Sequence, residues 1–218
     1  MSDEFSAGLR RLPVYLLLDC SYSMSGEPID ALRTGISALL SDLQTDPQAL
    51  ETVWLSVITF SSSATQVVPL TEIGAFQEPN IQVQGAASLG AGLTMLMDCI
   101  DREIRKTTST QEGDFKPMIF LITDGESTDS WKGPADELKK RNLNLIACAV
   151  GRYADETVLK QITENVIRLQ DTSTGPMVAC LQWVCESIKV TSQSASAQGD
   201  APVNLPALPA DHGIVTVP

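Results

Sequence analysis

The chain has 218 residues, of which 43% are hydrophobic, and its formal net charge at pH 7 is −12. This length suits one domain with a real hydrophobic core. So acidic a chain is a poor nucleic-acid binder, because it repels phosphates and releases no counterions. No uncharged apolar stretch approaches the ~20 residues that span a bilayer, so no membrane role is expected. The only histidine, His212, lies near the C-terminus, which argues against a histidine-based zinc site or a Ser-His-Asp triad.

Strand-like and helix-like segments alternate along the chain. In chain order, strands are predicted at 12–19, 52–60, 64–71, 117–123, 143–150 and 166–169, from apolar runs bounded by turn residues. Between and after them, helices are predicted from Pro28 to about Thr45 and at 90–106, 135–141, 155–165 and 175–190. The short polar connection at 61–63 predicts a hairpin, so the third strand is expected to run antiparallel to the second.

This alternation predicts the α/β class. The expected fold is a doubly wound, mostly parallel six-stranded sheet with one antiparallel edge strand and helices on both faces. In such folds ligands bind outside the carboxyl ends of the strands, where the strand order reverses. Asp19 and Asp124 each directly follow an apolar strand. We therefore expect both carboxylates at the same edge of the sheet.

Composition changes near the C-terminus. We expect a domain over residues 1–192 and a flexible tail over residues 193–218, which contains serines and prolines. The β-prone run Ile214–Val217 is suited to adding a strand to the sheet edge of a partner.

The five cysteines form no CxxC pair, so free and mostly buried thiols are expected: Cys20, Cys99, Cys148, Cys180 and Cys185. The first five residues, Met1–Phe5, lack the basic start and apolar run of a signal peptide. A cytoplasmic location is the resulting expectation.

The segment Asp19-Cys20-Ser21-Tyr22-Ser23 places two hydroxyls two residues apart, beside a carboxylate at a strand end. Magnesium prefers oxygen ligands in an octahedron and keeps several of its waters. Asp124 offers a second carboxylate from another strand end. These oxygen donors together predict a site for a hard divalent cation.

The pattern resembles the metal-ion-dependent adhesion site (MIDAS) of the von Willebrand factor A (vWA) domain family. The run Leu121–Gly125 is similar to that family's strand ending in Thr-Asp-Gly, and Gly85–Gly90 falls where the family has a threonine-bearing loop. Within the family, Leu12–Asp19, Gly26–Ile29 and Thr128–Trp131 resemble the TerY group. That group is associated with bacterial tellurite resistance and stress response.

The resemblance implies that Ser21 and Ser23 bind Mg²⁺ (or Mn²⁺ or Ca²⁺) directly. Asp19 and Asp124 would act largely through water or hydrogen bonds, and a carboxylate of a partner would complete the shell. One position departs from the family, because Ala87 stands where the ligand threonine belongs. Either the neighbouring Ser88 replaces it, or binding is weakened, or the cleft is vestigial and its hydroxyls only cap backbone groups.

Residues near the motif are candidates for partner binding and for helix capping. Tyr22 and Glu126 are candidate partner-binding residues, and Asp129 either tunes the cleft or caps the helix that follows. No catalytic residue is expected, since the sequence has no phosphate-binding loop, no DxD pair after the first strand and no GxSxG elbow.

The function expected is therefore a non-catalytic protein-binding module. By the TerY resemblance, its partners would include a Ser/Thr kinase and a metal-dependent phosphatase. A metal-independent scaffold that uses the tail or a helix face is the first alternative, and a magnesium-dependent phosphoryl-transfer enzyme is the second.

Overall fold

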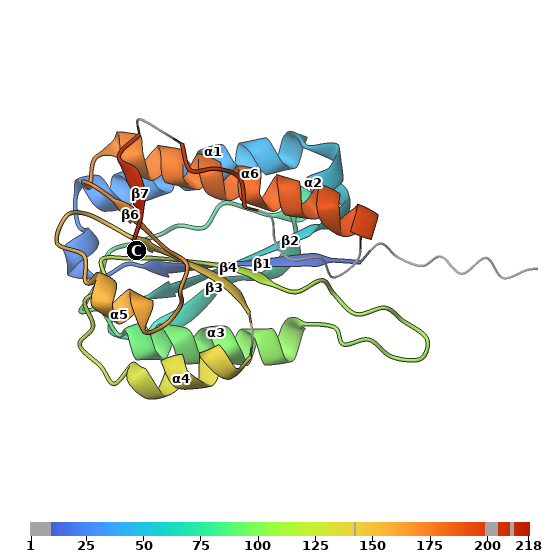
Figure 1. The fold of residues 1–218 in the computed structure, drawn as a ribbon, viewed down its shortest axis with the longest axis horizontal. Coiled ribbons are helices and arrows are strands. Elements are labelled where there is room, and N and C mark those ends of the chain that lie inside the picture. Colours follow the sequence, from blue (N-terminus) through green and yellow to red (C-terminus); the bar gives the residue numbers. More distant parts are fainter. Residues whose placement is uncertain (1–9, 142, 199–204, 210–211) are drawn as a thin grey trace, which may run out of the picture.

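The computed structural model describes residues 10–141, 143–198, 205–209 and 212–218. In this part of the chain seven strands form one sheet in the order β3-β2-β1-β4-β5-β6-β7 (Figure 1). Their bounds are β1 Leu12–Asp19, β2 Val53–Phe60, β3 Ala64–Glu72, β4 Met118–Thr123, β5 Asn144–Ala149, β6 Val166–Leu169 and β7 Ile214–Thr216. Strands β3 and β7, at the two edges, are antiparallel to their neighbours, and the five inner strands are parallel.

Helices cover both faces of the sheet. The helices are α1 Glu27–Thr45, α2 Pro47–Thr52, α3 Leu89–Glu103, α4 Lys132–Lys140, α5 Glu156–Lys160 and α6 Thr174–Gln198. Figure 1 shows α1, α2 and α6 on one face and α3, α4 and α5 on the other. Successive residues of β1 alternate between the two layers, so Leu16 packs in one core cluster and Leu17 in the other. The doubly wound fold expected from the sequence is confirmed.

The strand count differs from the expectation of six. The seventh strand, β7, lies in the predicted tail and pairs antiparallel with β6 of the same molecule rather than with a partner's sheet. Helix α6 also continues to Gln198, through the start of the expected flexible segment. In the C-terminal half of α6 the hydroxyls of Ser187, Thr191 and Ser194 each donate to the carbonyl four residues earlier, so these side chains do not interrupt the helix.

Two other expectations concern helix starts and thiols. Asp46 ends α1 as expected, but its side chain also accepts from the Ala49 N–H and so caps a short helix, α2, that was not predicted. All five cysteines are free and buried, as predicted.

None of the helices in the described ranges is long and apolar enough to cross a membrane. The expectations for Met1–Phe5 and for the tail at 199–204 and 210–211 fall outside the described residues.

Helices α1 and α6 approach closely at Gly35. A Cβ atom on this glycine would lie 2.3 Å from Leu181 Cδ1 and 3.1 Å from Leu181 Cβ. We expect Gly35→Ala to lower the free energy of unfolding by about 1–3 kcal/mol, because added volume in a packed contact forces strain. Urea denaturation measures the effect. The matched control is Gly133→Ala in α4, where no atom lies within 4 Å of the added Cβ. That variant should be as stable as the wild type or more so, and equal losses in both variants would contradict the close packing.

The fold creates one crevice where strand order reverses. From β1 the chain proceeds outward through β2 and β3, and then crosses to β4 and continues to β5 and β6 on the other side. The ends of β1 and β4, at Asp19 and Thr123, therefore lie side by side with their following loops diverging.

Candidate metal site

Asp19 is the buried base of the site. This residue is 0% exposed at the end of β1. Its Oδ1 accepts from the Ser21 N–H at 2.9 Å, and its Oδ2 accepts from the Thr123 hydroxyl at 2.7 Å. The carboxylate is thus held by its own loop on one side and by the neighbouring strand β4 on the other.

Ser21 and Ser23 stand above this carboxylate. Their Oγ atoms are 2.9 Å apart, with Ser21 buried and Ser23 exposed. Two octahedral ligands at 2.0–2.1 Å and at right angles around a magnesium ion are themselves about 2.9 Å apart. The loop is fixed by two main-chain bonds to the segment before α3, from Tyr22 N to Gly85 O and from Gln84 N to Cys20 O. At 2.9 Å the two hydroxyls are hydrogen-bonded to each other, and the same separation suits two neighbouring ligands of one magnesium ion.

Asp124 supplies the second carboxylate, directly after β4. It is half-buried, and its Oδ1 accepts from the Glu126 N–H at 3.0 Å. The turn that follows requires glycine, because Gly125 has φ +78° and a Cβ there would lie 2.7 Å from Asp155 O. A bond from Asp155 N to Asp124 O ties this turn to the loop before α5.

The electrostatics of the site favour a cation. Burial raises the pKa of Asp19, the hydrogen bonds from Ser21 and Thr123 lower it, and the nearby charge of Asp124 raises it again. Among the described residues no group of three or more His, Cys, Asp or Glu side chains could hold a metal, so an ion at this site would depend on the serine hydroxyls as well as on the two carboxylates. Two hydroxyls at ligand spacing beside two mutually repelling carboxylates fit a hard divalent ion.

The loop before α3 departs from this pattern. Ala87 is buried, and its carbonyl accepts from both the main-chain N–H and the hydroxyl of Thr128, at 2.8 and 2.9 Å. Its side chain brings no oxygen to the site. Ser88 is half-buried, with its N–H bonded to Ser61 O, and is not among the residues that line the cleft. The loop is therefore pinned at Ala87 and at Ser88, the two positions considered for a third oxygen ligand.

Asp129 has a structural role. Its two carboxylate oxygens accept from the N–H groups of Gly90 and Ala91, each at 2.9 Å. It thus caps α3, which lies earlier in the chain, and not the helix that follows it, α4, whose N-cap is Trp131. The expected capping role is correct in kind, but the expected helix is wrong, because the tertiary fold brings the start of α3 beside this loop.

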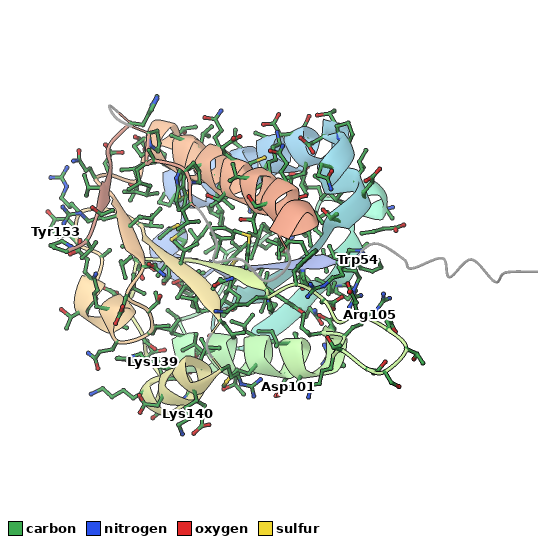
Figure 2. The ribbon with its side chains drawn as sticks, turned by 45° about the vertical axis from the view of Figure 1, so that its right-hand side comes forward. Trp54, Asp101, Arg105, Lys139, Lys140 and Tyr153 are labelled. Carbon is green, nitrogen blue, oxygen red and sulfur yellow. The ribbon has the colours of Figure 1, made fainter. Side chains whose placement is uncertain are left out.

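A cleft of about 250 Å³ is lined by Ser23 and Asp124, while Ser21 and Asp19 lie outside its lining. Its lining residues are Ser23, Met24, Pro28, Asp124, Glu126, Val150, Gly151, Arg152, Tyr153, Ala154, Asp171 and Thr172. Two aromatic side chains stand in solvent beside it, since Tyr22 is 69% exposed and Tyr153 is 87% exposed. Figure 2 shows Tyr153 projecting from the surface.

Sequence reasoning missed half of this cleft. Arg152, Tyr153, Asp171 and Thr172 lie in the loops after β5 and β6. Their position directly after parallel strands could have identified them, because all parallel strands of the sheet end at the same edge as Asp19. Tyr22 and Glu126 are exposed where the sequence predicted them, next to the serines and in the cleft wall, respectively.

Most of the chain matches one protein-family model. A family model described as the von Willebrand factor type A domain matches residues 14–174. This range includes all of β2 to β6, and all of β1 except its first two residues. This chain belongs to the von Willebrand factor type A domain family. The vWA domain is a protein-interaction module, and its fold and strand-end crevice match the arrangement described above.

Known relatives are larger proteins. The chain is 24% identical over 164 residues to the collagen alpha-1(XXI) chain of Xenopus laevis, covering 74% of this chain and 17% of that protein. It is 25% identical over 162 residues to matrilin-1 of Bos taurus, covering 72% of this chain and 29% of that protein. The chain therefore spans less than a third of the length of these relatives.

Similar solved structures share the fold. The pilus adhesin SpaC of Lactobacillus rhamnosus GG has a TM-score of 0.65 at 16% identity, over 83% of this chain and 30% of that one. The proximal thread matrix protein 1 of the mussel byssus has a TM-score of 0.54 at 19% identity, over 81% of this chain and 46% of that one. The latter was solved with a zinc-occupied MIDAS motif.

Proposed function

We propose that this vWA domain is a non-catalytic protein-binding module whose cleft holds a divalent ion. Magnesium is the first candidate ion, with Mn²⁺ or Ca²⁺ as substitutes. The observation that carries the proposal is the 2.9 Å separation of the Ser21 and Ser23 hydroxyls above the buried carboxylate of Asp19. The occurrence of a zinc-occupied MIDAS in a protein of the same fold supports it.

In this proposal the residues divide between holding the ion, orienting its ligands and contacting the partner. Ser21 and Ser23 hold the ion, while Asp19 orients Ser21 and balances charge from below. Asp124 acts from the far side, through water. The ion supplies a positive charge to which the carboxylate of a partner protein binds. Tyr22 and Glu126, on the rim, contact the partner.

A non-catalytic role is supported by the family of the chain, because the vWA domain is a protein-interaction module. The likeness in fold to a pilus adhesin agrees with a binding role.

Ser21→Ala should abolish saturable Mg²⁺ and Mn²⁺ binding, because it removes one direct ligand and the partner of Ser23. Isothermal titration calorimetry measures it. The matched control is Ser25→Ala, an exposed serine just beyond the 3-10 turn at Tyr22–Met24, which should bind as the wild type does. Equal metal binding by the wild type and Ser21→Ala would refute the site.

We further propose that the module is an adaptor in a bacterial, cytoplasmic stress-response system of the TerY type. Its partners would then be a Ser/Thr kinase and a metal-dependent phosphatase. The support is the sequence resemblance at Gly26–Ile29 and Thr128–Trp131. Co-purification of such a kinase and phosphatase from the same host with the wild type, but not with Ser21→Ala, tests it.

One observation favours a second candidate function. Ala87 withholds the third hydroxyl, and the loop that carries it is fixed through Thr128. A metal-independent scaffold would keep its partner in the presence of EDTA and after Ser21→Ala, whereas the metal-dependent module would lose it.

A further inference from the structure

The described parts of the C-terminal segment, 205–209 and 212–218, cover an apolar groove on the domain. The groove is formed by Ile146 of β5, Val166 and Ile167 of β6, and Trp183 of α6. Beside it runs the outer edge of β6, which lies at the end of the parallel strands. Without the segment, both the groove and the edge would face solvent.

The segment is held by contacts that any copy of the same sequence could make. The Trp183 indole N–H donates to Pro206 O at 3.0 Å. Ile214 is buried, and β7 pairs with β6. The strand pairing is extended by a bond from Gln170 N to Gly213 O and another from Val217 N to Val166 O. These are main-chain bonds and apolar contacts, which do not depend on which molecule supplies the segment.

The closure is also small and loosely packed. Strand β7 has only three residues. A space of about 290 Å³ remains between the segment and the groove. The segment is held by the main-chain bonds of β7 and by Ile214, Leu208 and Val217, which pack with the two core clusters. Release of the segment breaks these contacts, and the segment of a second copy would make the same ones.

The connection is short, so exchange needs the two molecules to approach closely. Six residues, 199–204, join Gln198, where α6 ends, to Leu205, where the docked segment begins. At roughly 3.3 Å per residue this connection reaches at most ~23 Å when extended. The segment can therefore close on its own groove, or on that of a neighbour packed against the same end of α6.

We propose that the β6 edge and the groove beside Trp183 form a strand-accepting site that takes the C-terminal segment of a second copy of this chain. Exchange is reciprocal and gives a twofold-symmetric dimer at high protein concentration. The site is distinct from the metal cleft, and the proposal does not rest on metal binding.

The register gives a sharp pair of variants. Gly213 and Val217 bond toward β6, so by strand alternation Val215 does as well, whereas the Thr216 N–H points away. Val215→Pro removes a hydrogen bond to β6. Thr216→Pro is the matched control, because it introduces the same ring without losing such a bond.

The first experiment titrates a fluorescent peptide of residues 205–218 onto the full-length chain in EDTA. The peptide should bind the Val215→Pro chain at least tenfold more tightly than the wild type, whose own segment competes. A Val215→Pro peptide should bind at least tenfold more weakly, and a Thr216→Pro peptide should bind normally. If the Val215→Pro chain does not fold, Ile214→Ala, which weakens the chain's own buried segment and leaves the groove unchanged, serves as the acceptor. No peptide binding to a folded acceptor would overturn the proposal.

The second experiment tests whether the segment of a second copy of the chain occupies the strand-accepting site. Two differently tagged full-length copies are mixed at up to ~1 mM, diluted and analysed by affinity capture and light scattering. Mixed dimers should form with the wild type and Thr216→Pro but not with Val215→Pro. If the peptide binds but the copies never exchange, the second-copy occupant is wrong.

Discussion

Ala87→Thr should tighten Mg²⁺ binding by at least tenfold, which corresponds to about 1.4 kcal/mol. The change places a hydroxyl at the position where the sequence resemblance predicts the family's ligand threonine. The loop is already fixed, since the Ala87 carbonyl accepts two hydrogen bonds from Thr128. Little conformational entropy is therefore lost when the new ligand binds the ion. Calorimetric titration of both proteins with Mg²⁺ and Mn²⁺ measures the gain.

The matched control for this prediction is Ala87→Val. Valine has the shape of threonine but no oxygen, so it reproduces any crowding around this buried residue without adding a ligand. It should bind no better than the wild type. If valine and threonine change the affinity equally, the effect is one of packing, and the absent hydroxyl is not what limits metal binding.

Asp114→Ala should lower the free energy of unfolding by about 3–5 kcal/mol, because it leaves a buried guanidinium without its counter-charge. The side chains of Arg11 and Asp114 are 9% and 2% exposed. They form two parallel hydrogen bonds, and Asp114 also accepts from Arg105 N at 2.8 Å. The Arg11 guanidinium also lies 4.7 Å from the centre of the Trp54 ring, near the loop that Figure 2 marks with Arg105.

Thermal and urea unfolding test this prediction against an exposed ion pair. The pair between Lys140 and Glu137 on α4 lies in solvent, so Glu137→Ala should have no measurable effect on stability. If Asp114→Ala proves as mild as Glu137→Ala, water reaches Arg11 and the pair does not anchor β1 to the segment before β4.

Much of the fold follows from local pattern. The strand at Leu12–Asp19 is predicted to the residue, because an unbroken apolar run buried on both faces ends at a charged residue. The hairpin of β2 and β3 follows from a turn too short for a parallel crossover. Strand β7 could not be assigned to this sheet, because its pairing depends on the free edge of β6 and on the groove beside Trp183, which exist only in the folded domain.

In the candidate site, too, some features are predicted from the sequence and others depend on the tertiary fold. The sequence predicts the approach of Asp19 and Asp124, because both follow parallel strands whose carboxyl ends share an edge. It does not predict the bond between Thr123 and Asp19, or that Asp129 caps α3, because these contacts join loops far apart in the chain. The position of Tyr153 on the cleft rim likewise depends on where the loop after β5 turns.

The bond from Gln170 N to Gly213 O links the C-terminal segment to the wall of the cleft. Asp171 and Thr172, the next two residues, line that wall. Any partner that orders this turn on docking at the proposed metal cleft would therefore also stabilise pairing at the β6 edge. By reciprocity, whatever a docked partner contributes to ordering this turn also favours the bound segment, by the same coupling free energy.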